Sequence, residues 1–527
     1  MYGKDLAGSR NGGSGGPSPR EVKGLRETWR FDTSDGDITG VPVVAGGTLV
    51  VGTSGGSIIA LDSVSGKVRW TRDIDQPING SAAIVAAPGT NAAGRVFVPV
   101  ARPHRPHLLA LDLADGSTLW DTVLDTQTDS DVYGSPVVWG RTVFIGVSGY
   151  YGEFSLTRGD VNVRGSVVAL DTGTGALRWK TYTVPPGRDG GAVWSTPVID
   201  TATGRLFAGT GNAYHDPAAP TTDAILALDA ARGTLLDHYQ ATPGDSWTLA
   251  EPTGPDFDFG ASPNLFTAPD GRKLVGNGQK SGIYWAFDRE TLDPVWQTQV
   301  GPGAASGGIL GSTAFDGRRI YGPVNSLGAG ATVWSLTRGG DLRWREHETG
   351  PVNYSPVAVA NGVAYITDFT MVVSARDAAT GAVLAKLPLD APTFAGVSVV
   401  GGAVYAATGT SMSPSGSVVA FGDTRDSAAT GSRGRPRLRL RVRPRRVRVG
   451  RRRLYRFRVT TRRSGRLRPV RGATIRFARR RVRTGRRGRA RLRVRLGRAG
   501  RRRARASKRG YRSARVVIRA LRTRRHR

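Results

Sequence analysis

Short apolar runs followed by a turn and a tryptophan recur along most of this 527-residue chain. A representative copy, GSVVALDTGTGALRW at 165–179, places an apolar run before Asp171 and a polar turn before Trp179. The run is too short for a typical helix and is rich in Val, Leu and Ala, and its β-branched residues favour a strand. The turn and the second short run predict an antiparallel hairpin.

The copies return at a regular interval. They occupy 56–70, 106–120, 165–179, 223–237, 282–296, 331–344 and 371–385, with an eighth, incomplete copy at 416–423. From Asp62 to Asp423 the seven intervals span 423 − 62 = 361 residues, a period of about fifty that is typical of propellers and solenoids. A further strand pair, such as the one at 40–53, precedes most copies. Four short antiparallel strands per copy predict one propeller blade each.

The incomplete copy predicts how the ring closes. GSVVAFGD at 416–423 lacks its tryptophan strand, whereas LRETWRFDT at 25–33 is a tryptophan strand with nothing before it. Because a shared last blade removes free sheet edges, we expect Trp29 to supply the missing strand. The expected fold of residues 1–423 is an all-β, eight-bladed β-propeller with N-terminal strand closure.

Charge divides the chain into two parts. Residues 431–527 hold 44 Lys and Arg and no Asp or Glu, so the other 430 residues carry 76 − 44 = 32 basic and 41 acidic residues, a net of −9. Apolar residues alternate with arginine from Leu438 onward, which favours a small β-sandwich after a linker at 424–436. We expect residues 437–527 either to bind a polyanion or to act as a spacer in an arginine-rich chain.

Composition excludes several classes of protein and site. The chain has no cysteine, which rules out disulfides, thiolate metal sites and a covalently attached c-type haem. No run approaches 18 apolar residues, so we expect no membrane span, and the opening MYGKDLAGSR has no apolar signal core. Aromatic residues are sparse in the basic part, so sequence-specific nucleic-acid binding is not expected.

The repeat ALD-x-x-x-G-x-x-x-W resembles that of quinoprotein dehydrogenases, which hold pyrroloquinoline quinone (PQQ) in an eight-bladed propeller. The stretches FDFGASPNLF at 257–266 and RGSVVALD at 164–171 resemble the polyvinyl-alcohol dehydrogenase branch. The resemblance implies PQQ- and calcium-dependent oxidation of an alcohol, with secondary and polymeric alcohols as candidate substrates. It also implies a periplasmic or extracellular location and an external electron acceptor such as a separate cytochrome. The pieces at 470–477 and 507–514 resemble bacterial Ig-like or carboxypeptidase-regulatory-like modules.

Four residues outside the repeat match the family's cofactor and metal positions. The resemblance makes Asn212 of GTGN and Glu153 calcium ligands, and Trp194 the floor on which PQQ lies. Arg164, in the R-G pair that follows Glu153, is assigned to the cofactor. The alternatives are a turn residue for Asn212, a core residue for Trp194 and a solvated loop acid for Glu153.

A carboxylate pair and a lysine supply the expected chemistry. Asp256 and Asp258 stand two positions apart, so on an extended strand they point the same way, which is costly unless a cation lies between them. The resemblance makes one of them the general base and lets Asp258 join the metal shell, with DFG slightly favouring Asp258 as the base. It assigns Lys280 to the quinone oxygens and the developing oxyanion. The alternatives are two solvated loop acids and a surface lysine.

A second class of function fits the same repeat. Non-catalytic scaffolds, such as outer-membrane assembly lipoproteins, resemble this repeat without holding a cofactor. In either class the repeat tryptophans 29, 70, 120, 179, 296 and 344 are expected to dock one blade on the next. The residues outside the repeat discriminate between an enzyme and a scaffold with an adhesive tail, because a scaffold does not need them together.

Overall fold

The computed structural model describes residues 1–85, 94–150, 153, 161–326, 330–347, 354–367, 369–411, 413–423, 438–463, 466–478, 480–508, 511 and 514–521. The chain divides into two compact units, 1–423 and 424–527. Strands dominate the described residues of both units, and the first unit also holds the short 3₁₀ helices η1 (Gly13–Gly15) and η2 (Val22–Gly24). Within the described ranges, no helix is long and apolar enough to cross a membrane.

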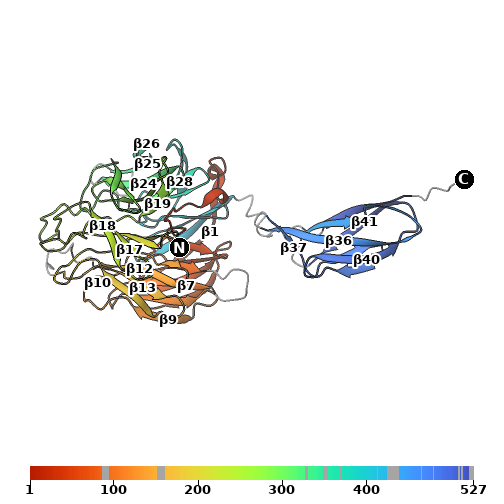
Figure 1. Ribbon diagram of the computed structural model, residues 1–527, viewed down its shortest axis with the longest axis horizontal. Helices are drawn as coiled ribbons and strands as arrows, with labels where there is room; N and C mark the ends of the chain where they lie inside the picture. Colours follow the sequence, from red (N-terminus) through yellow and green to blue (C-terminus); the bar gives the residue numbers. More distant parts are fainter. Residues whose placement is uncertain are drawn as a thin grey trace. The chain divides into compact units, whose positions relative to one another are not determined.

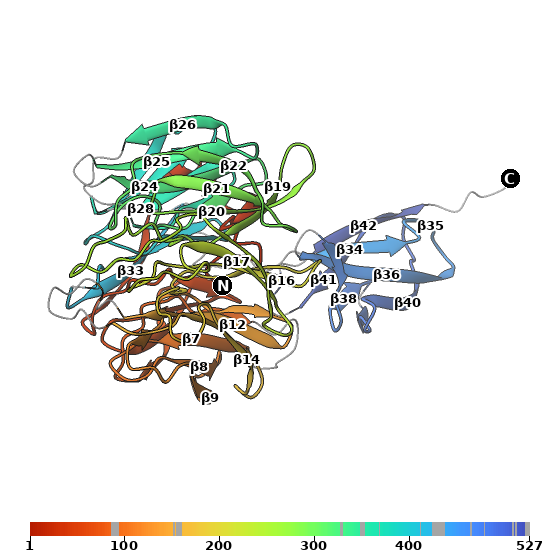
Figure 2. The same ribbon diagram turned by 60° about the vertical axis from the view of Figure 1, so that its left-hand side comes forward.

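The described residues of the first unit form eight antiparallel sheets, and seven of them are each built from four or five strands that follow one another in the sequence. These seven are β2 (Val43–Ala45), β3 (Thr48–Gly52), β4 (Ser57–Asp62) and β5 (Val68–Asp73); β6 (Ala83–Val85), β7 (Arg95–Val100), β8 (His107–Asp112) and β9 (Thr118–Val123); β10 (Ser130–Asp131), β11 (Val137–Trp139), β12 (Thr142–Gly149), β13 (Ser166–Asp171) and β14 (Leu177–Tyr182); β15 (Val198–Asp200), β16 (Arg205–Gly209), β17 (Ala224–Asp229) and β18 (Leu235–Gln240); β19 (Asn264–Thr267), β20 (Lys273–Gly278), β21 (Ile283–Asp288) and β22 (Pro294–Gln299); β23 (Ala314–Phe315), β24 (Arg319–Ser326), β25 (Gly330–Thr337) and β26 (Leu342–His347); β27 (Ala358–Ala360), β28 (Val363–Thr367), β29 (Val372–Asp377) and β30 (Val383–Pro388). In Figures 1 and 2 the sheets β23–β26 and β6–β9 lie at opposite sides of this unit.

The eighth sheet joins the two ends of the first unit. It holds β31 (Ser398–Val400), β32 (Ala403–Ala407), β33 (Gly416–Asp423) and β1 (Leu25–Thr33). β1 pairs antiparallel with β33, from Leu25 opposite Asp423 to Thr33 opposite Gly416. The strand containing Trp29 therefore completes the sheet of the incomplete last copy, as the sequence predicts.

Inner strands of successive sheets touch in a circle. β2 contacts β6, β6 contacts β11, and the contacts run on from β15 through β19, β23, β27 and β31 back to β2. A hydroxyl near the start of one sheet accepts a backbone N–H from the preceding sheet at 2.8 to 3.0 Å, at Ser81, Ser135, Thr196, Ser262 and Ser312. The bond from the N–H of Ser135 to Thr196 links β11 to β15 and completes the circle.

Each repeat tryptophan packs on the turn glycine of the next copy. A Cβ on that glycine would lie 2.5 to 2.8 Å from the indole, in the pairs Trp29–Gly66, Trp70–Gly116, Trp120–Gly175, Trp179–Gly233, Trp296–Gly340 and Trp344–Gly381. The backbone φ of these glycines is positive, which also disfavours other residues. Five of the six indole nitrogens donate to a carbonyl of the next copy at 3.0 to 3.3 Å. The Trp and Gly of the repeat therefore dock one sheet on the next.

The first residues of the chain bond to four neighbouring sheets. The carbonyls of Leu6, Ala7, Ser9 and Arg10 accept the backbone N–H groups of Ile199, Leu265, Phe315 and Val359, at 2.8 to 3.1 Å. These partners lie in β15, β19, β23 and β27, respectively. This segment satisfies N–H groups that the inner strands would otherwise leave without a partner.

The second unit packs two sheets on one hydrophobic cluster. One sheet holds β34 (Leu438–Arg443), β36 (Arg452–Arg463), β37 (Arg466–Pro469) and β40 (Arg489–Arg495), and the other holds β35 (Arg446–Arg448), β38 (Thr474–Phe477), β39 (Arg480–Arg483), β41 (Gly500–Ser507) and β42 (Ala514–Leu521). Along β34 the apolar residues are buried and the arginines exposed, as the period of two predicts. The predicted linker, 424–436, lies outside the described residues.

Candidate functional site

Four of the sequence-predicted residues lie next to the strands of two adjacent sheets. Trp194 precedes β15, Asn212 follows β16, Asp258 precedes β19 and Lys280 follows β20. Because β15 pairs antiparallel with β16, and β19 with β20, the start of one strand lies beside the end of its partner. All four residues therefore lie at the same edge of the two sheets. The neighbouring sheets therefore bring distant parts of the chain to one place.

Lys280 bridges the two aspartates. Its Nζ atom lies 2.6 Å from Oδ1 of Asp256 and 2.9 Å from Oδ2 of Asp258, and all three side chains are at most 4% exposed. Burial alone lowers the pKa of Lys280, but the surrounding carboxylates outweigh burial and raise it. Burial and the adjacent Asp258 raise the pKa of Asp256 well above its ordinary value.

Asp258 is held from three directions. Its Oδ1 accepts the backbone N–H of Asn212 at 2.8 Å, and its Oδ2 accepts the indole N–H of Trp194 at 3.1 Å in addition to the lysine. The second oxygen of Asp256 is buried and has no hydrogen-bond partner in the described part of the chain. The two aspartates therefore differ: both oxygens of Asp258 are bonded, whereas Asp256 keeps one oxygen without a partner.

Two glycines of the predicted motifs make room for this cluster. A Cβ on Gly260, in DFG, would lie 2.0 Å from the indole ring of Trp194, and a Cβ on Gly211, in GTGN, would lie 3.0 Å from Oδ1 of Asp258. Any larger residue at Gly260 would displace the indole. The glycines are therefore needed for close approach to Trp194 and Asp258.

Asn212 and Glu153 attach to the same segment. The side-chain amide of Asn212 donates to the carbonyls of Ala213 and Trp247 at 2.7 and 2.8 Å, and the carbonyl of Glu153 accepts the N–H of Leu249 at 2.7 Å. The two bonds of Nδ2 fix the Asn212 amide and leave Oδ1 as its remaining polar atom. Both predicted metal ligands thus border the Trp247–Leu249 segment.

The charges of Asp258 and Lys280, which with Asp256 form what we call the aspartate–lysine cluster, act on Glu153. Burial raises the pKa of Glu153 to about 8, with a further rise from Asp258 and an opposing effect of Lys280. Residues 151, 152 and 154–160, which flank it, lie outside the described residues. Together with Glu153, the cluster sets three carboxyl groups against one lysine, which favours bound protons or an added cation.

Arg164 contacts Tyr182 and Gln127. Its guanidinium lies over the ring of Tyr182, 3.8 Å from the centroid, and its backbone N–H donates to the side chain of Gln127 at 2.9 Å. Its Nε atom is buried without a hydrogen-bond partner among the described residues. No contact joins Arg164 to the aspartate–lysine cluster in the described ranges, and its role toward a cofactor stays a prediction.

Asp223 is a buried acid that sequence reasoning missed. Its side chain is 0% exposed, and neither carboxyl oxygen has a hydrogen-bond partner among the described residues. Its backbone N–H donates to the carbonyl of Gly211 at 2.9 Å, which places Asp223 beside the GTGN segment. Burial, followed by the charges of Asp258, Asp245 and Asp256, raises its pKa well above the ordinary value.

A signal for Asp223 exists in the repeat. It stands immediately before the apolar run, where the copies at 56, 165, 282 and 416 have glycine. Its φ is 47°, in the left-handed region, as φ is at Gly56 and Gly282. An acid that replaces a turn glycine at the start of a buried strand carries the cost of a strained backbone and the cost of burying a carboxyl group. Aligning the copies of the repeat would reveal this replacement.

The described residues do not supply a metal site from acidic and histidine side chains alone. They contain no group of three or more His, Asp or Glu residues that could hold a metal ion. A metal at this cluster would therefore need other donors, such as the Asn212 oxygen or an oxygen of a bound ligand.

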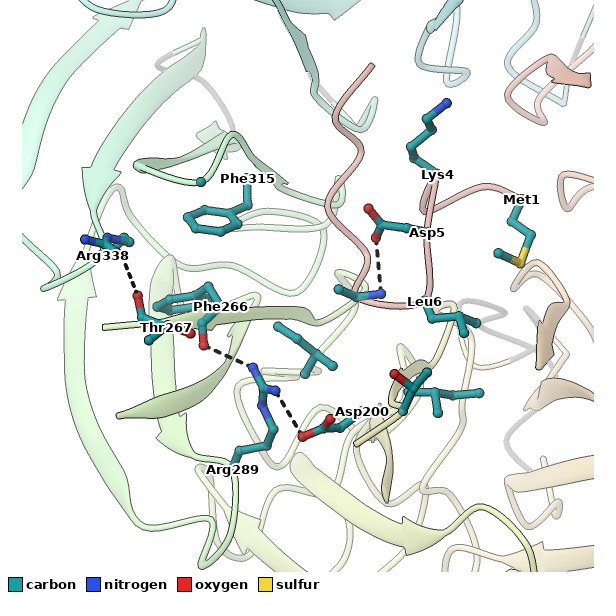
Figure 3. A pocket seen from close by; sticks show the side chains of 15 residues that line it. Met1, Lys4, Asp5, Leu6, Asp200, Phe266, Thr267, Arg289, Phe315 and Arg338 are labelled. Atoms are coloured by element: carbon teal, nitrogen blue, oxygen red, sulfur yellow. Dashed lines mark hydrogen bonds and ion pairs between the residues drawn. The ribbon is translucent and has the colours of Figure 1, made fainter. Parts of the chain in front are cut away.

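A hollow of about 850 Å³ lies at the other ends of the same strands. Its lining includes Asp200, the last residue of β15, and Phe266 and Thr267 at the end of β19. Arg289 donates to Asp200 and to the carbonyl of Phe266, each at 3.0 Å (Figure 3). Its charge is thus already paired, and the hollow is separate from the aspartate–lysine cluster.

Comparisons with known proteins agree with the resemblance seen in the sequence. The chain is 29% identical over 362 residues to a polyvinylalcohol dehydrogenase of Sphingopyxis sp. (strain 113P3). The matched region covers 62% of this chain and 55% of that protein. The chain thus spans about half the length of the curated relatives it matches.

Solved structures show the same fold. The quinohemoprotein alcohol dehydrogenase from Comamonas testosteroni superposes with a TM-score of 0.65 at 19% identity, covering 80% of each chain. A europium-containing methanol dehydrogenase superposes with a TM-score of 0.64 at 18% identity, covering 80% of this chain and 97% of that one. At such low identity these likenesses show the propeller fold alone.

A family model named PQQ_2, described as outer membrane protein assembly factor BamB, matches residues 26–298. These 298 − 26 + 1 = 273 residues are more than half of the 527 in the chain. The matched range covers the first five tryptophan strands, from Trp29 to Trp296, and the whole aspartate–lysine cluster. The protein therefore belongs to the PQQ-repeat family.

Proposed function

We propose that the protein is a PQQ-dependent alcohol dehydrogenase. The observation that carries the proposal is the buried bridge of Lys280 between Asp256 and Asp258, beside the partly exposed indole of Trp194. A scaffold gains nothing from burying three ionisable groups outside the repeat, because burial of charge is costly. The relatives support the same activity, since they are polyvinylalcohol and quinohemoprotein alcohol dehydrogenases.

The residues present fit the cofactor. Trp194 offers an aromatic face at the site, and its indole nitrogen is already bonded to Asp258, which fixes the ring. Lys280 lies 5.8 Å from the centre of that ring, within reach of oxygen atoms on a planar ligand stacked there. When bound, PQQ supplies the electrophilic carbonyl that accepts hydride from the alcohol carbon.

The residues also fit a calcium ion. Glu153, Asp258 and the remaining oxygen of Asn212 are hard oxygen donors of the kind calcium prefers. The raised pKa values of Glu153 and Asp256 have burial as their main cause and the proximity of Asp258 as a second, and a divalent cation would relieve this repulsion. Because a structural neighbour contains europium, a trivalent ion is included in the test below.

The chain's own groups divide the remaining work. Asp258 accepts the hydroxyl proton as general base, because it contacts Trp194, where the substrate would meet the cofactor. Lys280 neutralises Asp256 and donates to oxygen atoms that gain negative charge. Asp256, with its free buried oxygen, is the alternative base.

The finer features of the fold and setting belong to the same proposal. The eight sheets of residues 1–423 are taken as eight propeller blades, and the second unit as an Ig-like module that binds a polyanion. The enzyme works outside the cytoplasm, oxidises secondary or polymeric alcohols and passes electrons to a separate acceptor such as a cytochrome. Arg164, whose guanidinium lies over Tyr182, is included among the cofactor-binding residues of this proposal.

The test adds PQQ with Ca²⁺ or Eu³⁺ to the purified full chain and follows the quinone absorbance and alcohol-dependent dye reduction. Small primary and secondary alcohols and polyvinyl alcohol are compared. Asp258→Asn is expected to lose about 10²- to 10⁴-fold in rate while keeping PQQ bound, the usual effect of removing a general base. Asp270→Asn, at an exposed acid paired with Arg272, is the matched control and should be unchanged.

The outcomes separate the two candidate classes. If Asp256→Asn is inactive and Asp258→Asn retains its rate, the base is Asp256. If neither metal allows the chain to bind PQQ, the dehydrogenase proposal is wrong, and the non-catalytic scaffold remains.

A further inference from the structure

One outer face of the second unit is covered with arginine. Ten exposed arginines form it, and we call them the arginine face: Arg439, Arg441 and Arg443 on β34, Arg452, Arg456 and Arg458 on β36, and Arg489, Arg491, Arg493 and Arg495 on β40. Residues 431–527 contain no Asp or Glu, so no carboxylate side chain of this part can neutralise them. The face is a dense, uncompensated array of positive charge.

Strand register aligns these arginines in rows across the sheet. Arg443 stands opposite Arg456, which stands opposite Arg491, and the next row is Arg441, Arg458 and Arg489. Neighbours lie about 4.8 Å apart across the strands and about 6.8 Å apart along them. Like charges directly opposite each other destabilise a sheet, so the arrangement carries a cost in the free protein.

The fold does not require this cost. The inward positions of the same strands, including Tyr455, Phe457 and Val459, form the hydrophobic cluster between the two sheets. Any polar residue at the outward positions would preserve the period of two. The repeated choice of arginine opposite arginine therefore points to a partner that supplies negative charge.

We propose that the arginine face binds a linear polymer of phosphate groups that carries no nucleobases and lies along its rows. The proposal rests on the polyanion partner proposed above and assigns it a surface and a chemistry. A guanidinium group matches phosphate oxygens with two parallel hydrogen bonds, so arginine suits this partner better than a diffuse charge would require. A flexible chain of phosphates can place successive groups against successive arginines of a row.

Two observations select this partner over other anions. The aromatic residues Tyr455, Phe457 and Phe477 are buried in the cluster, so the face has no aromatic platform on which bases could stack. Of the exposed large apolar residues described in this unit, Leu467, Val517 and Leu521, only Leu467 on β37 faces the same side of this sheet as the arginines, where it stands opposite Arg462. Insertion into a lipid surface would require a cluster of such residues rather than one leucine at the end of the sheet.

The opposite sheet provides a matched control. Arg501, Arg503, Arg505 and Arg519 are exposed on β41 and β42, where Val517 and Leu521 interrupt the array. Removing four arginines from either sheet lowers the net charge by the same amount. A general attraction of charge predicts equal losses for the two variants, whereas a defined face predicts unequal losses.

The experiment measures binding of long-chain inorganic polyphosphate to the full chain at several salt concentrations. One variant carries Arg441→Gln, Arg456→Gln, Arg458→Gln and Arg491→Gln, and the control carries Arg501→Gln, Arg503→Gln, Arg505→Gln and Arg519→Gln. The first is expected to lose at least tenfold in affinity, with its slope of log affinity against log salt reduced by about 3, and the control to lose less than about threefold. Thermal melting checks folding, and Arg456→Gln with Arg491→Gln alone replaces the first variant if it melts early.

Each other result overturns a defined part. Equal losses of affinity in both variants would show that the arginine face is not the binding surface, while a polyanion partner would still stand. If the unaltered chain does not bind polyphosphate, both the arginine face as a binding surface and the polyanion partner are refuted. Tighter binding to a single-stranded oligonucleotide or an anionic vesicle of matched phosphate concentration refutes the chemistry proposed for the partner. Dye reduction with alcohol should be the same in all variants, so failure of this proposal is distinguishable from failure of the dehydrogenase.

Discussion

The indole nitrogen of Trp194 donates a 3.1 Å hydrogen bond to Oδ2 of Asp258, a residue 64 positions further along the chain. The two residues precede the first strands of adjacent sheets, β15 and β19. The bond ties the candidate base to the candidate cofactor platform, so the position of one fixes the position of the other. Changes to the indole should therefore affect both binding and rate.

Variants of Trp194 can separate these two effects. Trp194→Ala removes the aromatic face and should weaken PQQ binding by tenfold or more, about 1.4 kcal/mol. Trp194→Phe keeps an aromatic face but loses the N–H, so it should bind PQQ more tightly than Trp194→Ala and still show a lower turnover rate. Titration of the quinone absorbance gives the affinity, and dye reduction gives the rate. Equal affinity of Trp194→Ala and the unaltered protein would contradict the platform.

Metal binding should depend on pH through Glu153. Burial raises its pKa to about 8, so in the metal-free protein the carboxyl is protonated at neutral pH. Because a metal displaces that proton, the Ca²⁺ affinity should rise by about tenfold per pH unit below 8 and level off above it. Calorimetric titration with Ca²⁺ between pH 6 and 9 measures this.

The matched variant is Glu153→Gln, which keeps the shape and removes the titration. It should bind Ca²⁺ more weakly and show a flatter dependence on pH. A calcium affinity that is the same at pH 6 and pH 9 in the unaltered protein would show that Glu153 is not a ligand.

Asp223 should make the metal-free protein less stable as pH rises. Its pKa in the folded state is raised, so between its unfolded value near 4 and its folded value the folded state binds more protons than the unfolded state. The free energy of unfolding therefore falls with rising pH over that window. Asp223→Asn should flatten this fall, which thermal melts from pH 4 to 9 would record.

The control for Asp223 is again Asp270→Asn. Asp270 is exposed, and its pKa is lowered by the backbone N–H of Arg272, so the change should leave the fall in stability at high pH in place. If Asp223→Asn melts with the same pH dependence as the unaltered protein, the carboxyl has a partner, such as a bound water or cation.

Closure of the ring can be tested by deletion. Removing residues 1–33 exposes the edge of β33 and also removes the segment that bonds to β15, β19, β23 and β27. We expect an aggregating protein, because an open edge pairs with other chains. A deletion of residues 1–12 alone should remain more soluble, since it keeps β1. A fully soluble protein after the longer deletion, with unaltered melting, would show that β1 does not stabilise the ring.

The repeat predicted local structure better than it predicted the site. Copies such as 165–179 predict their hairpins because the apolar run, the turn glycine and the tryptophan act within one or two neighbouring sheets. Trp194, Asn212 and Lys280 were recognised as departures from the repeat, and the structure brings them together around Asp258. Their contacts depend on where adjacent sheets end, which no single copy encodes.

Two residues show the limits of a linear pattern. The motif assigns Arg164 to the cofactor, and the structure shows its guanidinium over the ring of Tyr182, so the assignment stays a prediction. Asp223 was missed because its neighbours in space, Gly211 and Asp258, belong to different loops. Side-chain direction and long-range burial decide both cases, and neither is visible in a linear pattern.

The pairing of Leu25 with Asp423 sets an order for folding during synthesis. The two residues are 423 − 25 = 398 positions apart, so β1 has no partner until nearly the whole first unit has left the ribosome. At about 5–20 residues per second, that wait is on the order of 20–80 seconds. Such a long-range contact slows folding and leaves the N-terminal strand open to chaperones, or to pairing with another nascent chain, until β33 arrives.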